Sequence, residues 1–329
     1  MTDPSEQRPR VLVARKLFDD LLDPLRARCH LQYHDEDRAA EPARLRQWMA
    51  DKDGVLLTAS ERVDGALLDA SPRLRVVSTM TVGFDHIDVG ACAARGIVVT
   101  HAPDVLTETT ADFGIALLLA ALRQIGEAER YLRAGRWQGW SPDAFAGADL
   151  HGSTLGIVGM GRIGRAIARR ASLGFGASIV YHNRNRLDPQ LEAESRARYS
   201  SLDSLLEQSD HVLLALPFSP AAHHLIGGVE IARMRRGATL VNIGRGGLVD
   251  EAALAQALQD GRLGAAGLDV FEGEPRVDAR LLQAPRLVLT PHIASASLPT
   301  RRAMVRLAVD NLLAVLDGRA PPNPVALGG

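Results

Sequence analysis

Lysine is almost missing from this 329-residue chain. Lysine and arginine together number 38, and the only lysines are Lys16 and Lys52, which leaves 38 − 2 = 36 arginines. A Schiff-base or general-base lysine therefore has almost no place to lie. Asp and Glu number 39, so the formal charge is 38 − 39 = −1. This balance gives no electrostatic reason to expect nucleic acid or an anionic membrane as a partner.

Cysteines and long apolar runs are also scarce. Cys29 and Cys92 lie far apart and form no CxxC motif, so neither a disulfide scaffold nor a thiolate zinc site is expected. The longest uninterrupted apolar run, residues 115–122, falls far short of the ~20 residues that span a bilayer. The polar first ten residues contain no apolar signal core. We therefore expect a soluble, cytoplasmic protein without a membrane partner.

The chain alternates short β-branched runs with longer helical stretches, a pattern typical of α/β folds with mostly parallel sheets. Its length suggests two domains at about 150 residues each. A proline-free stretch over residues 105–134 predicts one long helix, and residues 300–316 predict a terminal helix that returns to the first domain. The predicted strands are residues 10–14, 54–57, 74–78 and 97–100, and then 154–158, 178–182, 211–216, 239–243, 266–270 and 287–290.

A glycine-rich turn between a predicted strand and a predicted helix is the strongest single motif. It reads Gly159-Met160-Gly161-Arg162-Ile163-Gly164. In dinucleotide-binding domains the first glycine permits a tight turn, the second a close approach to the pyrophosphate, and the third close helix–strand packing. The helix N-terminus adds free N–H groups and a positive dipole end. We expect a dinucleotide site; the alternative is the same turn in an adenosyl-methionine methyltransferase.

The end of the next strand bears on the choice of cofactor. NAD enzymes usually carry an Asp or Glu about 20 residues after the glycines, where it binds the ribose 2′-hydroxyl. This chain has Asn183 there, followed by Arg184 and Arg186. A carboxylate would repel a 2′-phosphate, whereas an Arg fork can bind it. We predict NADPH as the preferred cofactor, with NADH possible; the alternative is a solvated basic turn with little selectivity.

Three chemically useful residues follow later strand ends. They are Arg245, Glu274 and His292, and the carboxyl ends of parallel strands are where such sheets bind ligands. Reduction of a carbonyl needs a proton donor, a group that tunes it and a cation for the substrate. Taken singly, the arginine could clamp phosphate, the glutamate could be a solvated loop acid and the histidine could belong to the core. Their occurrence together favours the catalytic interpretation.

The histidine pair at residues 223 and 224 is interpreted differently. His223 and His224 stand in a polar loop, and the sequence shows no third ligand at metal spacing. We expect a solvated loop pair, and no metal site in this chain.

Six segments, spread over nearly the whole chain, carry a family resemblance. They are residues 82–88, 107–112, 155–164, 242–251, 267–275 and 290–293. In these segments the sequence resembles the D-isomer-specific 2-hydroxyacid dehydrogenases. Residues 104–112 and 149–152 are most similar to glyoxylate/hydroxypyruvate reductases and bacterial 2-ketogluconate reductases. The resemblance implies a Rossmann-type doubly wound parallel sheet over residues 103–292, inserted in a flavodoxin-like substrate domain formed by residues 1–102 and 293–329.

The resemblance also implies a role for each catalytic candidate. Arg245 should bind the substrate carboxylate and the 2-oxo oxygen. His292 should donate a proton to the carbonyl oxygen as hydride arrives from the nicotinamide. Glu274 should pair with His292, fix its tautomer and favour the imidazolium. The backbone amides around Val82 and Gly83 should form a second anchor for the carboxylate.

Further residues are assigned to the cofactor and to a partner subunit by the same resemblance. Trp137 and Trp140 are similar to a tryptophan pair of which the second enters the partner's site, which implies a homodimer with Trp140 contacting the substrate of the other subunit. The alternative is two core or surface aromatics. Asp269 should face the nicotinamide amide. The remaining implied cofactor contacts are Arg162, Ile163, Ile243, Gly244 and Thr110.

The predicted reaction is reduction of a small 2-oxo acid to a D-2-hydroxy acid with NADPH, in a cleft between the two domains. Glyoxylate and hydroxypyruvate are the first expected substrates and 2-ketogluconate the third. The competing hypothesis is a cofactor-sensing protein of the same fold, similar to transcriptional co-repressors of this family. The complete set of Arg245, Glu274 and His292 favours the enzyme.

Overall fold

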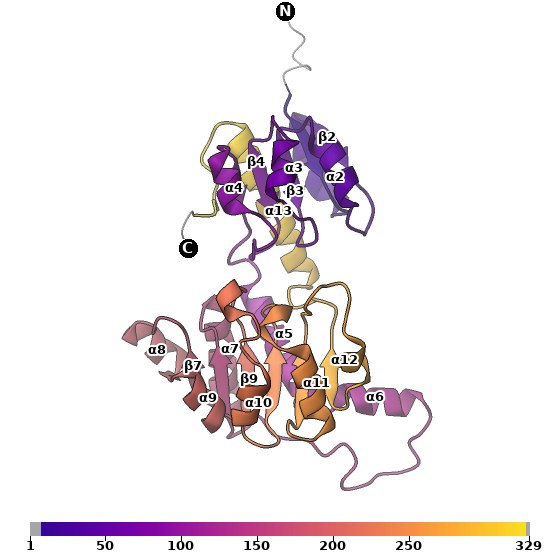
Figure 1. The fold of residues 1–329 in the computed structure, drawn as a ribbon, viewed down its shortest axis with the longest axis vertical. Helices are drawn as coiled ribbons and strands as arrows, with labels where there is room; N and C mark the ends of the chain where they lie inside the picture. Colours follow the sequence, from indigo (N-terminus) through magenta and orange to yellow (C-terminus); the bar gives the residue numbers. More distant parts are fainter. Residues whose placement is uncertain (1–7, 327–329) are drawn as a thin grey trace, which may run out of the picture. The chain divides into compact units, whose positions relative to one another are not determined.

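The computed structural model describes residues 8–326, and the chain divides into two compact units (Figure 1). Unit 1 comprises residues 1–106 and 297–329, and unit 2 comprises residues 107–296. The sequence predicts the boundaries after residues 102 and 292, and in the structure the units change after residues 106 and 296, which is four residues later in each case (106 − 102 = 4 and 296 − 292 = 4). Among the described residues, no helix is both long and apolar enough to cross a membrane.

Unit 1 is built on a five-stranded parallel sheet with the strand order β2-β1-β3-β4-β5. This is the flavodoxin-like order, in which short crossover helices cover both faces. The strands are β1 (Arg10–Val13), β2 (His30–Tyr33), β3 (Gly54–Leu57), β4 (Val76–Thr79) and β5 (Val98–Thr100). The helices are α1 (Asp23–Arg28), α2 (Pro42–Met49), α3 (Gly65–Asp69), α4 (Val89–Ala94) and the terminal α13 (Leu298–Leu316).

The terminal helix α13 packs on β3 and β4 in unit 1. The Ser78 hydroxyl on β4 donates a hydrogen bond of 2.9 Å to the Ala308 carbonyl on α13. A side chain at Gly54 would press against Leu312 at 3.0 Å, so the absence of a Cβ on β3 permits this close packing. The helices α2, α3 and α4 contribute Leu45, Met49, Leu67, Leu68 and Cys92 to the other layer of the core.

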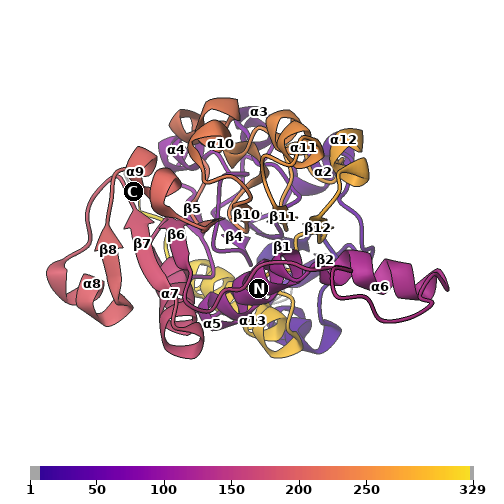
Figure 2. The ribbon, with the colours of Figure 1, turned by 90° about the horizontal axis from the view of Figure 1, so that it is seen from below.

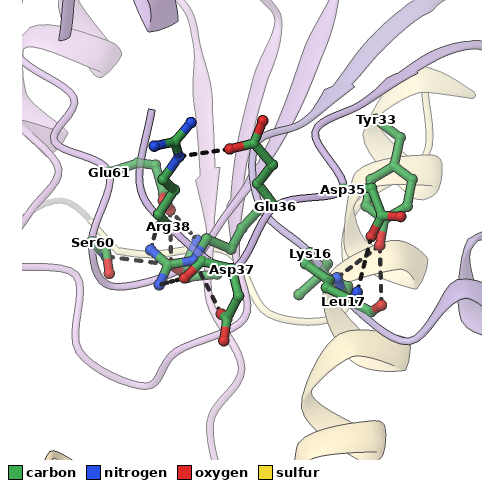
Figure 3. A network of polar contacts seen from close by, with 11 residues as sticks. Lys16, Leu17, Tyr33, Asp35, Glu36, Asp37, Arg38, Ser60 and Glu61 are labelled. Carbon is green, nitrogen blue, oxygen red and sulfur yellow. Dashed lines mark hydrogen bonds and ion pairs between the residues drawn. The ribbon is translucent and has the colours of Figure 1, made fainter. Parts of the chain in front are cut away.

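A polar network joins the segments that follow three strands of unit 1 (Figure 3). The Tyr33 hydroxyl on β2 donates to the Leu17 carbonyl at 3.1 Å and accepts from its N–H at 3.0 Å. Glu61, after β3, is 2 % exposed and lies 3.6 Å from the guanidinium of Arg15. The segment after β1 is therefore hydrogen-bonded to β2 and forms an ion pair with the segment after β3.

Unit 2 contains a seven-stranded parallel sheet with the order β12-β11-β10-β9-β6-β7-β8. Counted within this unit the order is 7-6-5-4-1-2-3, the doubly wound arrangement of a Rossmann-type domain. The strand order reverses between β6 and β9, where such sheets bind ligands. The strands are β6 (Thr154–Val158), β7 (Ser178–His182), β8 (Ala197–Tyr199), β9 (His211–Leu214), β10 (Thr239–Asn242), β11 (Ala265–Leu268) and β12 (Leu287–Leu289).

Helices cover both faces of this sheet (Figure 2). On one face lie α9 (Leu202–Gln208), α10 (Gly228–Arg233) and α11 (Glu251–Gln259), and on the other lie α5 (Thr107–Leu122) and α7 (Arg162–Phe175). Each face has its own apolar core. The remaining helices of the unit are α6 (Ile125–Arg133), α8 (Pro189–Ser195) and α12 (Ala279–Gln283), with single 3-10 turns at Pro220–Ala222 and Gly246–Leu248.

The long helix predicted over residues 105–134 is wrong, because the structure forms two helices there. Gln124 adopts a left-handed conformation, with φ 50°, between α5 and α6. The chain that follows α6 returns to this break: Ala148 donates to the Leu122 carbonyl at 3.1 Å, and the Gln124 amide donates to the Ala146 carbonyl at 3.1 Å. Tertiary hydrogen bonds thus override a local sequence that favours a continuous helix.

Candidate active site

The glycine turn of unit 2 has the geometry of a phosphate-binding loop. Gly159 directly follows β6 and has φ 98°, and a Cβ there would lie 2.7 Å from the Ala215 backbone. Gly161 precedes α7 and has open space where a Cβ would stand, so a ligand can approach the backbone closely. A Cβ on Gly164 would come within 2.2 Å of the Gly159 oxygen, so this glycine sets the close packing of helix on strand. A different structural requirement therefore explains the glycine at each of the three positions.

Two further features of unit 2 bear on whether a dinucleotide fits. The N-cap of α7 is Gly161, which has no side chain to cap the helix, so the first N–H groups of α7 remain available to an anionic ligand. The Thr110 hydroxyl on α5 is buried and has no hydrogen-bond partner among the described residues. A dinucleotide would satisfy both features, so the residues present fit such a cofactor.

Asn183 supports the glycine turn directly. Its side-chain oxygen accepts a hydrogen bond of 2.7 Å from the Met160 N–H. The position that carries a carboxylate in many NAD enzymes is therefore occupied by a neutral group that holds the loop itself.

The two arginines after β7 differ in their surroundings. Arg184 is exposed. Arg186 forms two hydrogen bonds of 2.8 Å with the two carboxylate oxygens of Glu192 on α8. Those bonds, together with one of 2.6 Å from the Tyr181 hydroxyl, hold the pKa of Glu192 at about 2. The guanidinium fork of Arg186 thus faces a carboxylate of its own chain, and an anionic ligand would compete with Glu192 for it.

Arg245 stands just after β10, in a loop that a buried amide holds in place. Asn242 is 0 % exposed; its side-chain N–H donates to the Arg245 carbonyl at 2.8 Å and its oxygen accepts from the Gly244 N–H at 3.0 Å. The Arg245 guanidinium donates to the Gly244 carbonyl at 2.9 Å. Ile243, in the same loop, is buried. The role of Asn242 was missed at the sequence level, where its position at a strand end before a glycine was the available signal.

His292 and Glu274 form a hydrogen-bonded pair. The distance from His292 Nδ1 to Glu274 Oε2 is 2.8 Å, and the other carboxylate oxygen accepts from the Phe271 N–H at 2.9 Å. The side chains are 39 % and 34 % exposed, so both remain accessible. Burial works against the charged carboxylate, but the hydrogen bond and charge of His292, the Phe271 amide and the charge of Arg245 together lower the pKa of Glu274. All three predicted catalytic residues therefore belong to one electrostatic group.

A buried carboxylate fixes the backbone that carries His292. Asp269 follows β11, is 0 % exposed, and accepts from the Ile293 N–H at 2.8 Å, the Ala294 N–H at 2.9 Å and the Thr290 hydroxyl at 2.7 Å. Burial raises the pKa of Asp269, although these bonds oppose the rise. They also hold the backbone next to His292, whose φ of 55° lies in the left-handed region that few non-glycine residues adopt. The cofactor contact predicted for Asp269 stays a prediction.

Comparison with known proteins agrees with this arrangement. Residues 115–294, more than half of the chain, match the family model described as "D-isomer specific 2-hydroxyacid dehydrogenase, NAD binding domain". The chain belongs to the D-isomer-specific 2-hydroxyacid dehydrogenases.

Curated relatives of this dehydrogenase match it over nearly their whole length. A glyoxylate/hydroxypyruvate reductase B of Klebsiella pneumoniae is 46% identical over 320 residues, which cover 97% of this chain and 98% of the relative. A glyoxylate reductase of Thermococcus gammatolerans is 42% identical over 322 residues, covering 97% and 96%.

Solved structures show the same fold. A crystal structure of an NADPH-dependent glyoxylate/hydroxypyruvate reductase from Sinorhizobium meliloti, in complex with NADP and malonate, has a TM-score of 0.87 and 40% identity and covers 97% of both chains. A protein from Thermus thermophilus has a TM-score of 0.89 and 45% identity, with 96% of this chain and 100% of that one covered. The expected fold class, a Rossmann-type sheet with a flavodoxin-like second sheet, is confirmed.

In unit 1 of the dehydrogenase, the predicted carboxylate anchor lies after β4. The His101 ring nitrogen Nδ1 is 2.9 Å from the Val82 carbonyl, and the Thr81 hydroxyl donates to the Gly83 carbonyl at 2.7 Å. These contacts hold the carbonyl oxygens of the turn. That the backbone amides around Val82 and Gly83 bind the substrate carboxylate stays a prediction.

The two tryptophans assigned to a dimer contact are exposed. Trp137 is 62 % and Trp140 83 % exposed, in the segment that follows α6. The helix α6 itself has no buried residue, and it extends away from the sheet of unit 2 (Figure 2). Ile125 and Leu132 on this helix are 53 % and 58 % exposed. The possibility that the tryptophans belong to the core is thereby excluded.

The histidine pair has a third neighbour that the sequence did not reveal. The Glu272 carboxylate lies 2.8 Å from His223 Nε2 and 2.9 Å from His224 Nε2. The sequence shows no third ligand at metal spacing, but the loop after β11 comes back to the loop after β9 and brings Glu272 to the pair. Glu272 lies 48 positions after His224 in the chain, so no local motif reveals this contact.

Proposed function

We propose that the chain reduces glyoxylate and hydroxypyruvate to the corresponding 2-hydroxy acids, with NADPH as the preferred cofactor. The supporting observation is the His292–Glu274 pair at 2.8 Å, with Arg245 close enough to act on the same carboxylate. The names of the relatives point to the same substrates and, for the Sinorhizobium enzyme, to NADPH. 2-Ketogluconate is kept as the third candidate substrate.

In this mechanism each residue of the chain has one task. Arg245 binds the carboxylate and the 2-oxo oxygen of the substrate, since a guanidinium carries a fixed charge and two parallel donors. His292 donates the proton from Nε2 to the carbonyl oxygen, because its Nδ1 faces Glu274. Glu274 stabilises the protonated ring. NADPH supplies the hydride when it is bound.

The preference for NADPH rests on Arg184 and on the absence of a carboxylate at Asn183. The exposed Arg184 and the neutral Asn183 favour a 2′-phosphate over a free ribose hydroxyl. Arg186 can also bind the 2′-phosphate, but only when the phosphate replaces the Glu192 carboxylate as its partner. We therefore propose NADPH first, with NADH as a slower substitute.

We further propose a homodimer held through α6 and the segment after it. The support is the set of exposed apolar side chains there, of which Trp140 is the most exposed. In the proposed dimer Trp140 reaches the substrate of the partner subunit. A Trp140→Ala variant should shift the ratio of kcat/KM between hydroxypyruvate and glyoxylate; an unchanged substrate profile would count against this contact.

A panel of kcat/KM values tests the proposed reaction. Glyoxylate, hydroxypyruvate, 2-ketogluconate, pyruvate and phenylpyruvate are each assayed with NADPH and with NADH. We expect the first two with NADPH to give the highest values, and His292→Ala to lower the rate by roughly 10²–10⁴. Cofactor binding without turnover of any of these acids would instead favour the sensor hypothesis.

A further inference from the structure

Two adjacent histidines and one glutamate converge on a single point of unit 2. His223 Nε2 lies 2.8 Å and His224 Nε2 lies 2.9 Å from the two carboxylate oxygens of Glu272. The three ligand atoms all lie within 4.8 Å of one another. Consecutive side chains of an extended segment point to opposite sides, so this convergence of neighbours needs a local explanation.

The backbone of His224 provides that explanation. This residue has φ 51°, in the left-handed region, and its N–H donates to the Gly247 carbonyl at 2.8 Å. The turn brings both imidazole rings to the same side, where they stack with centroids 3.8 Å apart and planes inclined by 22°. An uncommon conformation is thus maintained at the residue that makes the two ring nitrogens converge.

The backbone that carries the Glu272 side chain is also held in place. The Glu272 N–H donates to the Glu251 carboxylate at 2.6 Å, which anchors the loop after β11 to the start of α11. The Phe218 ring packs edge-on against His223, with the ring centroids 6.1 Å apart. The ligand set is therefore braced from several elements rather than carried on one mobile loop.

We propose that His223, His224 and Glu272 form a binding site for one Zn²⁺ ion or a divalent ion of similar chemistry. Two imidazole nitrogens and one carboxylate oxygen are a typical ligand set for zinc, and three protein ligands leave a fourth position for water. In the bound state each ring proton resides on Nδ1, so that Nε2 is free to coordinate the metal. The side chains are 45 %, 37 % and 45 % exposed, which gives the ion a path from solvent.

The site would link two loops that carry candidate catalytic residues. Glu272 lies two positions before Glu274, and Gly247, which binds the His224 N–H, lies two positions after Arg245. A bound ion would fix the loop after β9 against the loop after β11. It is not part of the proposed proton or hydride transfer, so the inference does not depend on the proposed reaction.

Metal titration of the untagged full-length chain tests the site. After chelator treatment, CoCl₂ is added and the visible absorption is recorded, and ZnCl₂ binding is measured by calorimetry. We expect one ion per chain. His223→Gln, His224→Asn and Glu272→Gln should each weaken binding by at least ~10–100-fold, since even the loss of a supporting partner costs that much. Asn tolerates the left-handed conformation, so His224→Asn removes a ligand without adding backbone strain.

Two controls locate the ion. His151→Gln alters an exposed histidine elsewhere in unit 2 and should leave the stoichiometry and affinity unchanged. His292→Asn should also keep one bound ion, although it removes the proposed proton donor. The proposal is overturned if the wild-type chain binds no Co²⁺ or Zn²⁺, if the three ligand variants that retain wild-type circular dichroism bind like the wild type, or if His292→Asn abolishes binding.

Discussion

Replacing Glu274 by glutamine isolates the charge of the carboxylate that faces His292. Glutamine has the same size, and its oxygen can still accept from the Phe271 N–H. Its amide N–H₂ would then face His292 Nδ1, a donor where the imidazolium needs an acceptor. The variant should therefore disfavour the protonated ring while leaving the shape of the site intact.

The expected magnitude follows from the geometry of the pair. A hydrogen bond to a charged group contributes about 1.5–3 kcal/mol. The two side chains are 34 % and 39 % exposed, so solvent screening places this bond at the lower end of that range, at about 1.5–2 kcal/mol. At 1.4 kcal/mol for each factor of ten, kcat/KM for glyoxylate reduction should fall about 10–30-fold, mainly in kcat.

The assay is NADPH oxidation with glyoxylate, with KM measured for both reactants. Glu207→Gln is the matched control, because Glu207 is an exposed acid of unit 2 whose partner, Arg233, lies 3.7 Å away. The control should retain wild-type kinetics and an unchanged melting temperature. A Glu274→Gln rate within twofold of the wild type, or an equal loss in Glu207→Gln, would refute the assigned role.

Three further perturbations probe the scaffold and the cofactor choice. Gly164→Ala should lower the free energy of unfolding by about 1–3 kcal/mol in urea titrations, because its Cβ would lie 2.2 Å from a backbone oxygen. The control is Gly174→Ala on the same helix, where the new Cβ would have no atom within 4 Å, so this variant should be as stable as the wild type or more stable. Burial raises the pKa of Asp210, but its hydrogen bonds prevail and lower it overall. In the folded protein the charged Asp210 therefore contributes stability at every pH above about 3.8, the ordinary pKa of an aspartate in the unfolded chain, and this contribution is lost as the pH falls through the lower pKa of the folded state. Asp210→Asn should accordingly lower the urea midpoint more at about pH 7 than at about pH 3. Glu192→Gln should free Arg186 and raise kcat/KM with NADPH up to about fivefold relative to NADH; a fall in that ratio would contradict the competition.

The parts of the fold that could be predicted are those with strong local patterns. The buried strands β6 and β10 are short apolar runs followed by glycines, and the turn between β6 and α7 carries its own signature. The strands β2 and β8 were missed because both are partly exposed edge strands of only four and three residues, HLQY and ARY, too short for a periodic pattern to stand out. The break at Gln124 was missed because distant hydrogen bonds, rather than a glycine or proline, produce it.

The same distinction holds for the candidate site. Arg245, Glu274 and His292 could be found because each follows a strand end in a recognisable run. The hydrogen bonds that the Ile293 and Ala294 N–H groups donate to Asp269 could not be found, because they join positions 24 and 25 residues apart. Glu272 was overlooked as a partner of the histidine pair for a similar reason. Sequence patterns indicate the candidate residues for the chemistry, and tertiary contacts decide what holds those residues in place.

The buried polar residues around this site show how residues at strand ends position the loops of the site. Asn242 and Asp269 are both 0 % exposed. Asn242 is the last residue of β10, and Asp269 directly follows β11. A buried carboxylate is costly, as the raised pKa of Asp269 indicates, and three hydrogen bonds to the loop after β12 offset that cost. An apolar side chain would avoid the cost but would leave the N–H groups of residues 293 and 294 unpaired and His292 free to leave its left-handed conformation. Stability is therefore coupled to the position of His292, the proposed proton donor, and we expect these two buried residues to tolerate substitution less well than exposed residues of the same loops.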